Sequence, residues 1–186
     1  MENSNESYDN CNKNNTNVID NQDQLLNNNN IKRIGIKLAP YNPSGMEVVD
    51  IAIKLLDIKD DDILYDLGCG DGRLLITSCQ LNKLIKCIGI EYDLDIYNKA
   101  IELVNRFELT EQITIIHENV LNINFYHATK IFIYLIPDGI KQLKDKLIDA
   151  LERDVIIVTY VFSIPDIKPS EVIVYKSSTK IYLYKK

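Results

Sequence analysis

The stretch that decides the fold is residues 65–73, which read YDLGCGDGR. It follows a short apolar run at residues 63–67 and opens an amphipathic stretch at residues 73–80, so we expect a strand, a turn and a helix in that order. Its glycines let the backbone turn tightly and approach a ligand without a Cβ in the way. In a doubly wound sheet, ligands bind beyond the carboxyl ends of the strands, where this turn falls. The stretch therefore predicts both the fold and the position of a site.

Short apolar runs alternate with helical patterns along the rest of the chain. Strands are expected at residues 63–67, 85–91, 113–117, 130–136 and 155–161, and helices at residues 48–56, 73–80, 94–108 and 139–151. Ser44 is expected to cap the first helix, and a helix at residues 120–127 is the weak element of the pattern, because that stretch is short and poorly periodic. Two last strands, at residues 172–176 and 181–184, flank Ser177 and Ser178 and suit an antiparallel hairpin. The pattern predicts an α/β fold, a doubly wound and mostly parallel sheet covered on both faces.

Residues 1–30 differ from the rest of the chain. They are crowded with Asn, and their few apolar residues follow no period. Such a segment cannot bury enough apolar surface to offset its ordering entropy, so we predict a disordered tail at residues 1–30 and one domain at residues 31–186.

The composition argues against several kinds of partner and site. The net charge of -6 argues against a stable nucleic-acid partner, because phosphate binding depends on Lys and Arg. The four cysteines show no metal-ligand spacing with His117 or His127 and read as reduced thiols, so no metal and an intracellular location are expected. No apolar run approaches the roughly 18 residues that span a bilayer.

Acidic residues around the glycine-rich turn point to a nucleoside-type ligand. Asp66 can bond a ligand's amino group, and Glu91, about 20 residues on at the end of the second strand, can hold two ribose hydroxyls. Asn119 follows the third strand and either bonds an adenine edge or is an ordinary loop residue. A dinucleotide is disfavoured because the turn reads GxGxG and not GxGxxG. The expected ligand-binding residues are Asp66, Leu67, Gly68, Cys69, Gly70, Gly72, Glu91, Tyr92 and Asn119.

These residues resemble a known family. Residues 66–73 are similar to the signature of S-adenosylmethionine-dependent methyltransferases, whose class I members have a seven-stranded Rossmann-like sheet closed by a hairpin. Residues 41–43, 134–137 and 162–165 with 168–169 are similar to the small protein-lysine methyltransferases that include the mitochondrial enzymes acting on ATP synthase c-subunit and adenine nucleotide translocase. The resemblance covers roughly residues 41–174. The family usually has Asp at Asn119, and its animal mitochondrial members have an apolar segment where this chain is rich in Asn.

The resemblance implies S-adenosylmethionine as cofactor and a protein substrate with an accessible lysine. It alone suggests the mitochondrion, with the cytoplasm as the other compartment, and the oligomeric state stays open. The acceptor site is expected at the end of the fourth strand, with Tyr134, Pro137 and Asp138 there and Tyr41 and Phe162 at its sides. Each has a plainer interpretation: Tyr134 could pack in the core, Asp138 could cap a helix, and Tyr41 could be a hydrophobic staple.

Two other functions stay open at this point. One is a methyltransferase acting on a small molecule or RNA, because one fold supports many substrates. The other is a protein that binds S-adenosylmethionine without turnover. Arg73 is expected to support the glycine-rich loop, and His117 reads as a satisfied residue at the edge of a strand.

Overall fold

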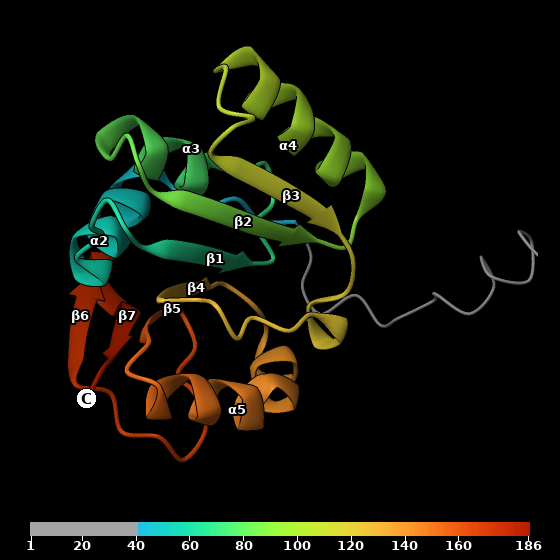
Figure 1. The fold of residues 1–186 in the computed structure, drawn as a ribbon. Helices are drawn as coiled ribbons and strands as arrows, with labels where there is room; N and C mark the ends of the chain where they lie inside the picture. Colours follow the sequence, from blue (N-terminus) through green and yellow to red (C-terminus); the bar gives the residue numbers. More distant parts are fainter. Residues whose placement is uncertain (1–40) are drawn as a thin grey trace, which may run out of the picture. The chain divides into compact units, whose positions relative to one another are not determined.

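The computed structural model describes residues 41–186, and its elements alternate between strand and helix along most of the chain (Figure 1). The predicted tail at residues 1–30 and the predicted start of the domain at residue 31 lie outside the described residues. The elements are α2 (Met46–Leu56), β1 (Ile63–Leu67), α3 (Arg73–Leu81), β2 (Lys86–Glu91), α4 (Leu94–Arg106), β3 (Ile113–His117), the 3₁₀ turn η1 (Val120–Asn122), β4 (Lys130–Ile133), α5 (Pro137–Glu152), β5 (Ile156–Tyr160), β6 (Glu171–Tyr175), the 3₁₀ turn η2 (Lys176–Ser178) and β7 (Thr179–Tyr184).

The strands form one seven-stranded sheet in the order β3-β2-β1-β4-β5-β7-β6. The first five strands of the chain are parallel, and β7 pairs antiparallel with both β5 and β6. The order reverses between β1 and β4, which places the site at the carboxyl ends of these two strands. The predicted class I fold with its C-terminal hairpin is confirmed.

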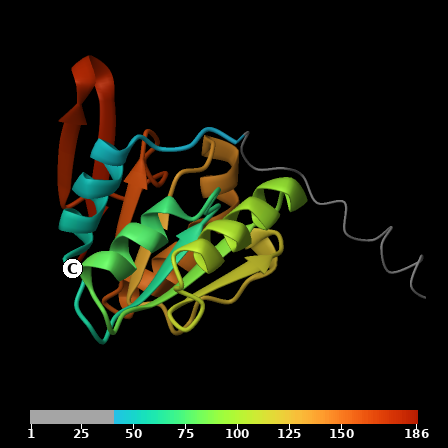
Figure 2. The same ribbon diagram turned by 90° about the horizontal axis from the view of Figure 1, so that it is seen from above.

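Helices cover the two faces of the sheet unequally. Figure 2 shows α2, α3 and α4 side by side over one face, where they bury a core that includes Leu56, Leu75 and Val104. The other face packs against α5, with Ile140, Leu143 and Leu147 fully buried, and against the short η1 (Figure 1). Residues 120–127 thus form only one 3₁₀ turn, as their weak period indicated.

The start of α2 differs from the prediction. Its N-cap is Gly45, with an extended backbone and no side-chain cap bond, so the prediction of a Ser44 cap is wrong. The carbonyl of Ser44 instead accepts a hydrogen bond of 2.9 Å from the Arg73 guanidinium. That tie to the glycine-rich loop fixes the path of the chain as it enters α2.

The end of β4 and the start of α5 also differ from the prediction, because β4 is shorter and α5 starts earlier. The strand ends at Ile133, and α5 starts at Pro137 with Ile136 as its N-cap. Proline suits the first helical position, because it lacks an N–H that would have no partner there. Asp138 therefore lies within the first turn of α5, and its interpretation as an N-cap is wrong.

Candidate active site

The glycine-rich loop between β1 and α3 has a backbone that only glycine adopts easily. Gly68, Gly70 and Gly72 all have positive φ, at 89°, 57° and 77°. A Cβ on Gly68 would lie 3.0 Å from Leu135, and one on Gly70 would lie 3.2 Å from the ring of Tyr41. The loop is therefore approached closely from two sides, by the β4–α5 link and by the chain before α2.

Backbone amides of this loop are directed into the protein. Gly68 and Cys69 both donate to the carbonyl of Ile90, Gly70 donates to the Glu91 carboxylate, and Gly72 donates to the Cys69 carbonyl. The loop is held rigidly against the end of β2. Amide donors for a ligand carboxylate therefore belong to the first turn of α3 and not to these four positions.

Leu67 and Cys69 contribute to the loop through their backbone. The side chain of Leu67 is fully buried in the core on the α5 face. The Cys69 thiol packs toward Gly89 on β2, and burial raises its pKa well above the usual value. Neither side chain is presented to a ligand.

Asp66 is a buried carboxyl group at the end of β1. It is 3% exposed, and burial, followed by the negative charges of Glu91 and Asp71, raises its pKa to about 8. A positively charged group bound beside it would lower that pKa again. The site is thus electrostatically suited to a cationic ligand.

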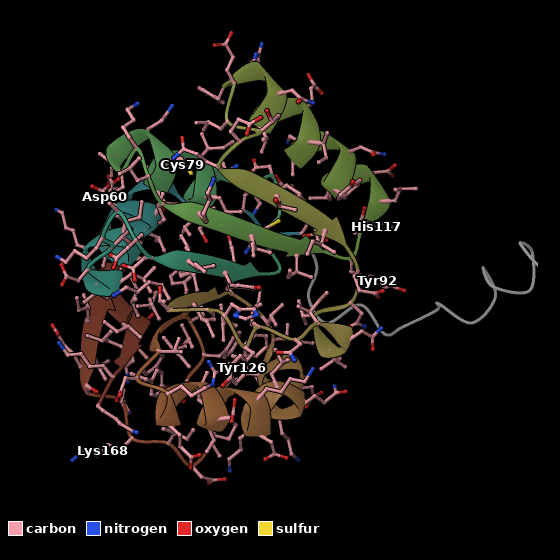
Figure 3. All side chains as sticks on the ribbon, viewed as in Figure 1. Asp60, Cys79, Tyr92, His117, Tyr126 and Lys168 are labelled. Atoms are coloured by element: carbon pink, nitrogen blue, oxygen red, sulfur yellow. The ribbon has the colours of Figure 1, made fainter. Side chains whose placement is uncertain are left out.

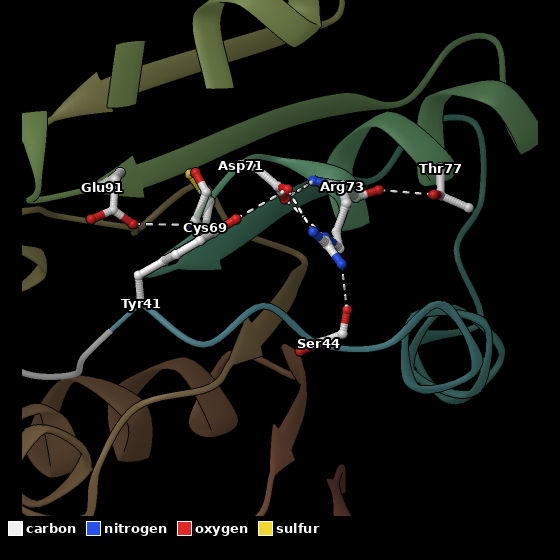
Figure 4. A network of polar contacts seen from close by, with 8 residues as sticks. Tyr41, Ser44, Cys69, Asp71, Arg73, Thr77 and Glu91 are labelled. Carbon is white, nitrogen blue, oxygen red and sulfur yellow. Dashed lines mark hydrogen bonds and ion pairs between the residues drawn. The ribbon is translucent and has the colours of Figure 1, made fainter. Parts of the chain in front are cut away.

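Glu91 ends β2 and organises both neighbouring loops. One carboxylate oxygen accepts from the Gly70 amide at 3.0 Å and the other from the Asp93 amide at 2.8 Å. Each carboxylate oxygen keeps a further lone pair, so the group can also accept from ligand hydroxyls. Figure 4 shows this carboxylate facing the loop that carries Cys69.

The chain before α2 is fastened across the glycine-rich loop (Figure 4). Arg73 binds both carboxylate oxygens of Asp71, at 2.9 and 2.6 Å, and the Tyr41 hydroxyl donates to the same carboxylate at 3.2 Å. Burial alone would raise the pKa of Asp71, but its bonds to Arg73 outweigh burial and leave that pKa below the usual value. These contacts and the Arg73 bond to Ser44 hold residues 41–44, which we call the strap. Arg73 supports the loop, as predicted, and Tyr41 covers it instead of stapling α2.

Three of the predicted acceptor residues lie in the β4–α5 link and the first turn of α5. Tyr134 is half-buried, and its hydroxyl accepts a hydrogen bond of 2.9 Å from the Asn42 side chain. Its ring lies 4.6 Å from that of Tyr160 at an interplanar angle of 61°. Pro137 and Asp138 are exposed. Because Asn42 follows Tyr41 directly, one short segment contacts both Tyr134 and the glycine-rich loop.

The link after β3 holds its own residues in place. The Asn119 side-chain oxygen accepts from the Leu121 amide at 2.9 Å and so caps η1, which leaves its NH₂ group as the part that could face a ligand. His117 lies 3.0 Å from the carbonyl of the half-buried Tyr92 and stacks against Tyr97, as expected of a satisfied edge residue (Figure 3). Within residues 41–186, no group of three or more His, Cys, Asp or Glu is placed to hold a metal ion.

Sequence reasoning missed three residues of this region. Asn42, Asp71 and Tyr160 each bond or stack on a predicted site residue. Asp71 lies inside the signature and could have been found there. Asn42 and Tyr160 become neighbours of Tyr134 only through the pairing of β4 with β5 and the path of the strap, which no local pattern reports.

The loop fits S-adenosylmethionine on three observations. Its glycines leave room that any Cβ would fill, Asp66 is a buried carboxyl group suited to an ammonium, and Glu91 stands at the end of β2 where a ribose would be gripped. The fold agrees, because an RNA methyltransferase from Salinibacter ruber in complex with S-adenosyl-L-homocysteine superposes with a TM-score of 0.73 and 25% identity, over 77% of this chain and 93% of that one. Fold and site together define a class I S-adenosylmethionine-dependent methyltransferase.

Two further comparisons narrow the class. The model of the ANTKMT methyltransferase domain matches residues 66–171. A protein-lysine N-methyltransferase of Saccharolobus islandicus (strain REY15A) is 30% identical over 148 residues, which are 78% of this chain and 92% of that protein. The chain belongs to the ANTKMT methyltransferase family.

More remote relatives share a smaller part of the chain. An rRNA adenine N-6-methyltransferase of Clostridium perfringens is 29% identical over 90 residues, which are 48% of this chain and 35% of that protein. None of the helices described for residues 41–186 is long and apolar enough to cross a bilayer.

Proposed function

We propose that this protein transfers a methyl group from S-adenosylmethionine to the side chain of lysine in a protein substrate. The family and the protein-lysine N-methyltransferase that matches most of its own length support this choice of acceptor. The cofactor is held by Asp66, Gly68, Gly70, Gly72 and Glu91, with Leu67, Cys69, Tyr92 and Asn119 shaping the site around them. The acceptor lies by Tyr134, Pro137 and Asp138, and Tyr41 closes the side nearest the loop.

One observation carries the choice of a lysine over RNA, namely the charge of the sheet edge that bears the site. The links that directly follow β1, β2, β3 and β4 contain no Lys or Arg. Acidic residues end β2, occupy the links or lie in the first turn of α5: Asp71, Glu91, Asp93, Glu118 and Asp138. An acidic edge attracts a cationic side chain and repels a phosphate backbone.

Lysine must lose a proton before it can attack. With an ordinary pKa near 10.4, about one lysine in a thousand is neutral near pH 7.4, which costs roughly 4 kcal/mol. Bound S-adenosylmethionine supplies an electrophilic methyl group next to a positive charge. Tyr134 and Tyr160 exclude water from one side of the acceptor, and desolvation of this kind lowers an amine's pKa. Asp138, exposed in the first turn of α5, can hold the incoming ammonium, whose proton is lost directly to solvent.

The rest of the reaction is alignment. Methyl transfer is an in-line displacement, and holding donor and acceptor in register can supply about 7–11 kcal/mol in favourable cases. The contact of Leu135 with Gly68 sets the spacing between the acceptor link and the cofactor loop. No dedicated general base is needed in this scheme.

The test is transfer of labelled methyl from S-adenosylmethionine into fractions of a cell lysate. Wild type is compared with Asp66→Asn, which keeps the side-chain shape, and with Asp60→Asn, an exposed acid at the other end of β1 (Figure 3). Label in ribonuclease-resistant protein that maps to lysine, and is lost only in Asp66→Asn, supports the proposal. Label found only in RNA or small molecules would refute the lysine assignment, and cofactor binding without any label would indicate a regulatory protein.

The compartment and the oligomeric state are separate questions. The intracellular location indicated by unpaired cysteines, and the mitochondrion suggested by the family, stay predictions. Fractionation of cells that express the tagged full chain addresses the first.

A further inference from the structure

We propose that three tyrosines beyond β4 form a binding site for the lysine side chains of the substrate, with Tyr160 as its specificity-determining residue. We call Tyr134, Tyr160 and Tyr175 the tyrosine row. Its inner end, Tyr134 with Tyr160, would take the acceptor lysine, and its outer end, Tyr175 with Glu47, a second cationic side chain. The proposal rests on the proposed function, because it assigns the row to that substrate.

The topology brings these three residues to one edge. Tyr134 follows β4, while Tyr160 and Tyr175 are the last residues of β5 and β6. Because β7 is antiparallel to both β5 and β6, those two strands run in the same direction, and β4 is parallel to β5. All three tyrosines therefore lie at the carboxyl edge, in order away from the cofactor loop. They also belong to the same face, since each packs against the core that lies under α2.

The inner end is linked directly to the cofactor loop. Tyr134 precedes Leu135, whose side chain would be 3.0 Å from a Cβ on Gly68. Asn42 holds the Tyr134 hydroxyl at 2.9 Å, and Tyr160 supports its ring at 4.6 Å. Burial, followed by the neighbouring Tyr134 and Tyr175, raises the pKa of Tyr160, so its ring stays neutral. Neutral aromatic faces of this kind attract an alkylammonium.

The outer end already holds a lysine ammonium, from the chain itself. The Lys176 ammonium lies 4.8 Å from the centre of the Tyr175 ring and 2.8 Å from a Glu47 carboxylate oxygen. The Tyr175 hydroxyl donates to the same carboxylate. Both charged side chains are exposed, at 69% and 67%, so an external cation can exchange with Lys176. An aromatic face with a carboxylate beside it is the chemistry that a lysine side chain requires.

A purely structural row predicts something different. In that case Tyr160 would fill space between α2 and the sheet, and its removal would lower stability without a specific effect on the acceptor. Lys176 would then be an ordinary surface partner of Glu47, and its loss would not strengthen binding of anything. The two accounts therefore differ in whether the loss of Lys176 strengthens binding of a lysine peptide.

The experiment is calorimetric titration of an acetylated and amidated tetralysine peptide into the full chain saturated with S-adenosylhomocysteine. Tyr160→Ala should weaken peptide binding roughly three- to thirtyfold, the range of a partly desolvated cation–π contact, and Tyr160→Phe should restore it to within about threefold. Lys176→Gln should tighten binding, because it vacates the outer end. Tyr182→Ala is the matched control, since Tyr182 is half-buried on β7 but packs on the α5 face.

Several outcomes would overturn the row. They are no peptide binding by wild type, unchanged binding in Tyr160→Ala, an equal loss in Tyr182→Ala, or no gain in Lys176→Gln. Thermal melting and the affinity for S-adenosylhomocysteine are measured on each variant, so that a loss of folding or of the cofactor site is recognised separately.

The transfer assay separates this proposal from the proposed function. Lysine label that is equally efficient in wild type and Tyr160→Ala refutes the row and leaves the function standing. RNA label with tetralysine binding that still depends on Tyr160 refutes the function and leaves a lysine-binding row. Support for both requires that Tyr160→Ala raise KM for a lysine acceptor while the affinity for cofactor stays unchanged.

Discussion

Asp66 is a carboxyl group whose proton must leave when a cation binds beside it. Its pKa of about 8, raised chiefly by burial, means that the free protein carries this proton at neutral pH. A bound ammonium favours the carboxylate, so binding releases the proton. Affinity for S-adenosylmethionine should therefore rise with pH up to about 8 and then level off at this residue.

The measurement is calorimetry at pH 7 in two buffers of different ionisation enthalpy. Wild type should release close to one proton more per bound cofactor than Asp66→Asn. The comparison cancels any titration of the cofactor itself. Equal proton release by the two proteins would contradict the assignment of Asp66.

Glu91 should be needed for cofactor affinity. Glu91→Ala is expected to weaken binding of S-adenosylmethionine by roughly 1.5–3 kcal/mol, the value of a lost charge-assisted hydrogen bond. The loss should reach the upper part of that range, because the Gly70 and Asp93 amides lose their acceptor as well. Equilibrium dialysis against the exposed control Glu102→Ala checks this, and unchanged affinity in a folded Glu91→Ala would refute the ribose assignment.

Site residues were predictable where their position in the sequence places them at the end of a predicted strand. Asp66 is next to last in β1 and Glu91 is last in β2, so the pairing of these parallel strands brings both to one edge. Their exact partners were not predictable, because the Glu91 bond to Gly70 depends on how the loop folds back. Tyr160 was missed, since its contact with Tyr134 spans neighbouring strands that are distant in the chain.

At the level of elements, β2 and α3 fit together only because β2 contains Gly89. A Cβ there would lie 2.7 Å from the Cys69 sulfur and 2.8 Å from both Leu75 and Ile115 side chains. Gly89→Ala should therefore lower the free energy of unfolding by about 1–3 kcal/mol through overpacking. Urea denaturation measures it, with Gly45→Ala as the control, since nothing lies within 4 Å of a Cβ there. A loss at Gly45 as large as that at Gly89 would contradict this account.

The order and type of the elements followed from apolar periodicity, but their ends did not. Pro137 is the first residue of α5, as is common for proline. The prediction followed the apolar periodicity instead, and so placed the start of the helix two residues late. Ser44 has the side chain of a good N-cap, yet its carbonyl is engaged by Arg73 and Gly45 takes that position. Both errors arise where tertiary contacts decide among several acceptable starts.

At the scale of the whole molecule, the acidic carboxyl edge should influence how a basic substrate arrives. At 0.1 M ionic strength, salt largely screens the interaction between exposed charges that are more than about 10 Å apart. KM for a lysine-rich acceptor should therefore rise several-fold between low and high salt, while kcat changes little. Initial rates at several salt concentrations check this, with a neutral short acceptor peptide carrying one lysine as the control. A KM that falls with salt would indicate an anionic substrate.

The class I fold could be predicted because one signature, five parallel strands and a terminal hairpin all agreed. The family resemblance, which depended on softer matches in residues 134–137 and 162–165, is confirmed by the match over residues 66–171. The roles of individual acceptor residues stay predictions, since they depend on a substrate that the chain alone does not define.

The strap has a consequence for the order in which the two substrates enter. Tyr41 covers the glycine-rich loop, and the adjacent Asn42 holds Tyr134 on the acceptor side, so a single short segment touches both halves of the site. We therefore expect a compulsory order, in which the cofactor binds first, the acceptor binds second, and the demethylated cofactor leaves last. Product-inhibition patterns should therefore show S-adenosylhomocysteine competing with S-adenosylmethionine and not with the acceptor. The turnover rate at saturation should equal the rate at which the strap opens.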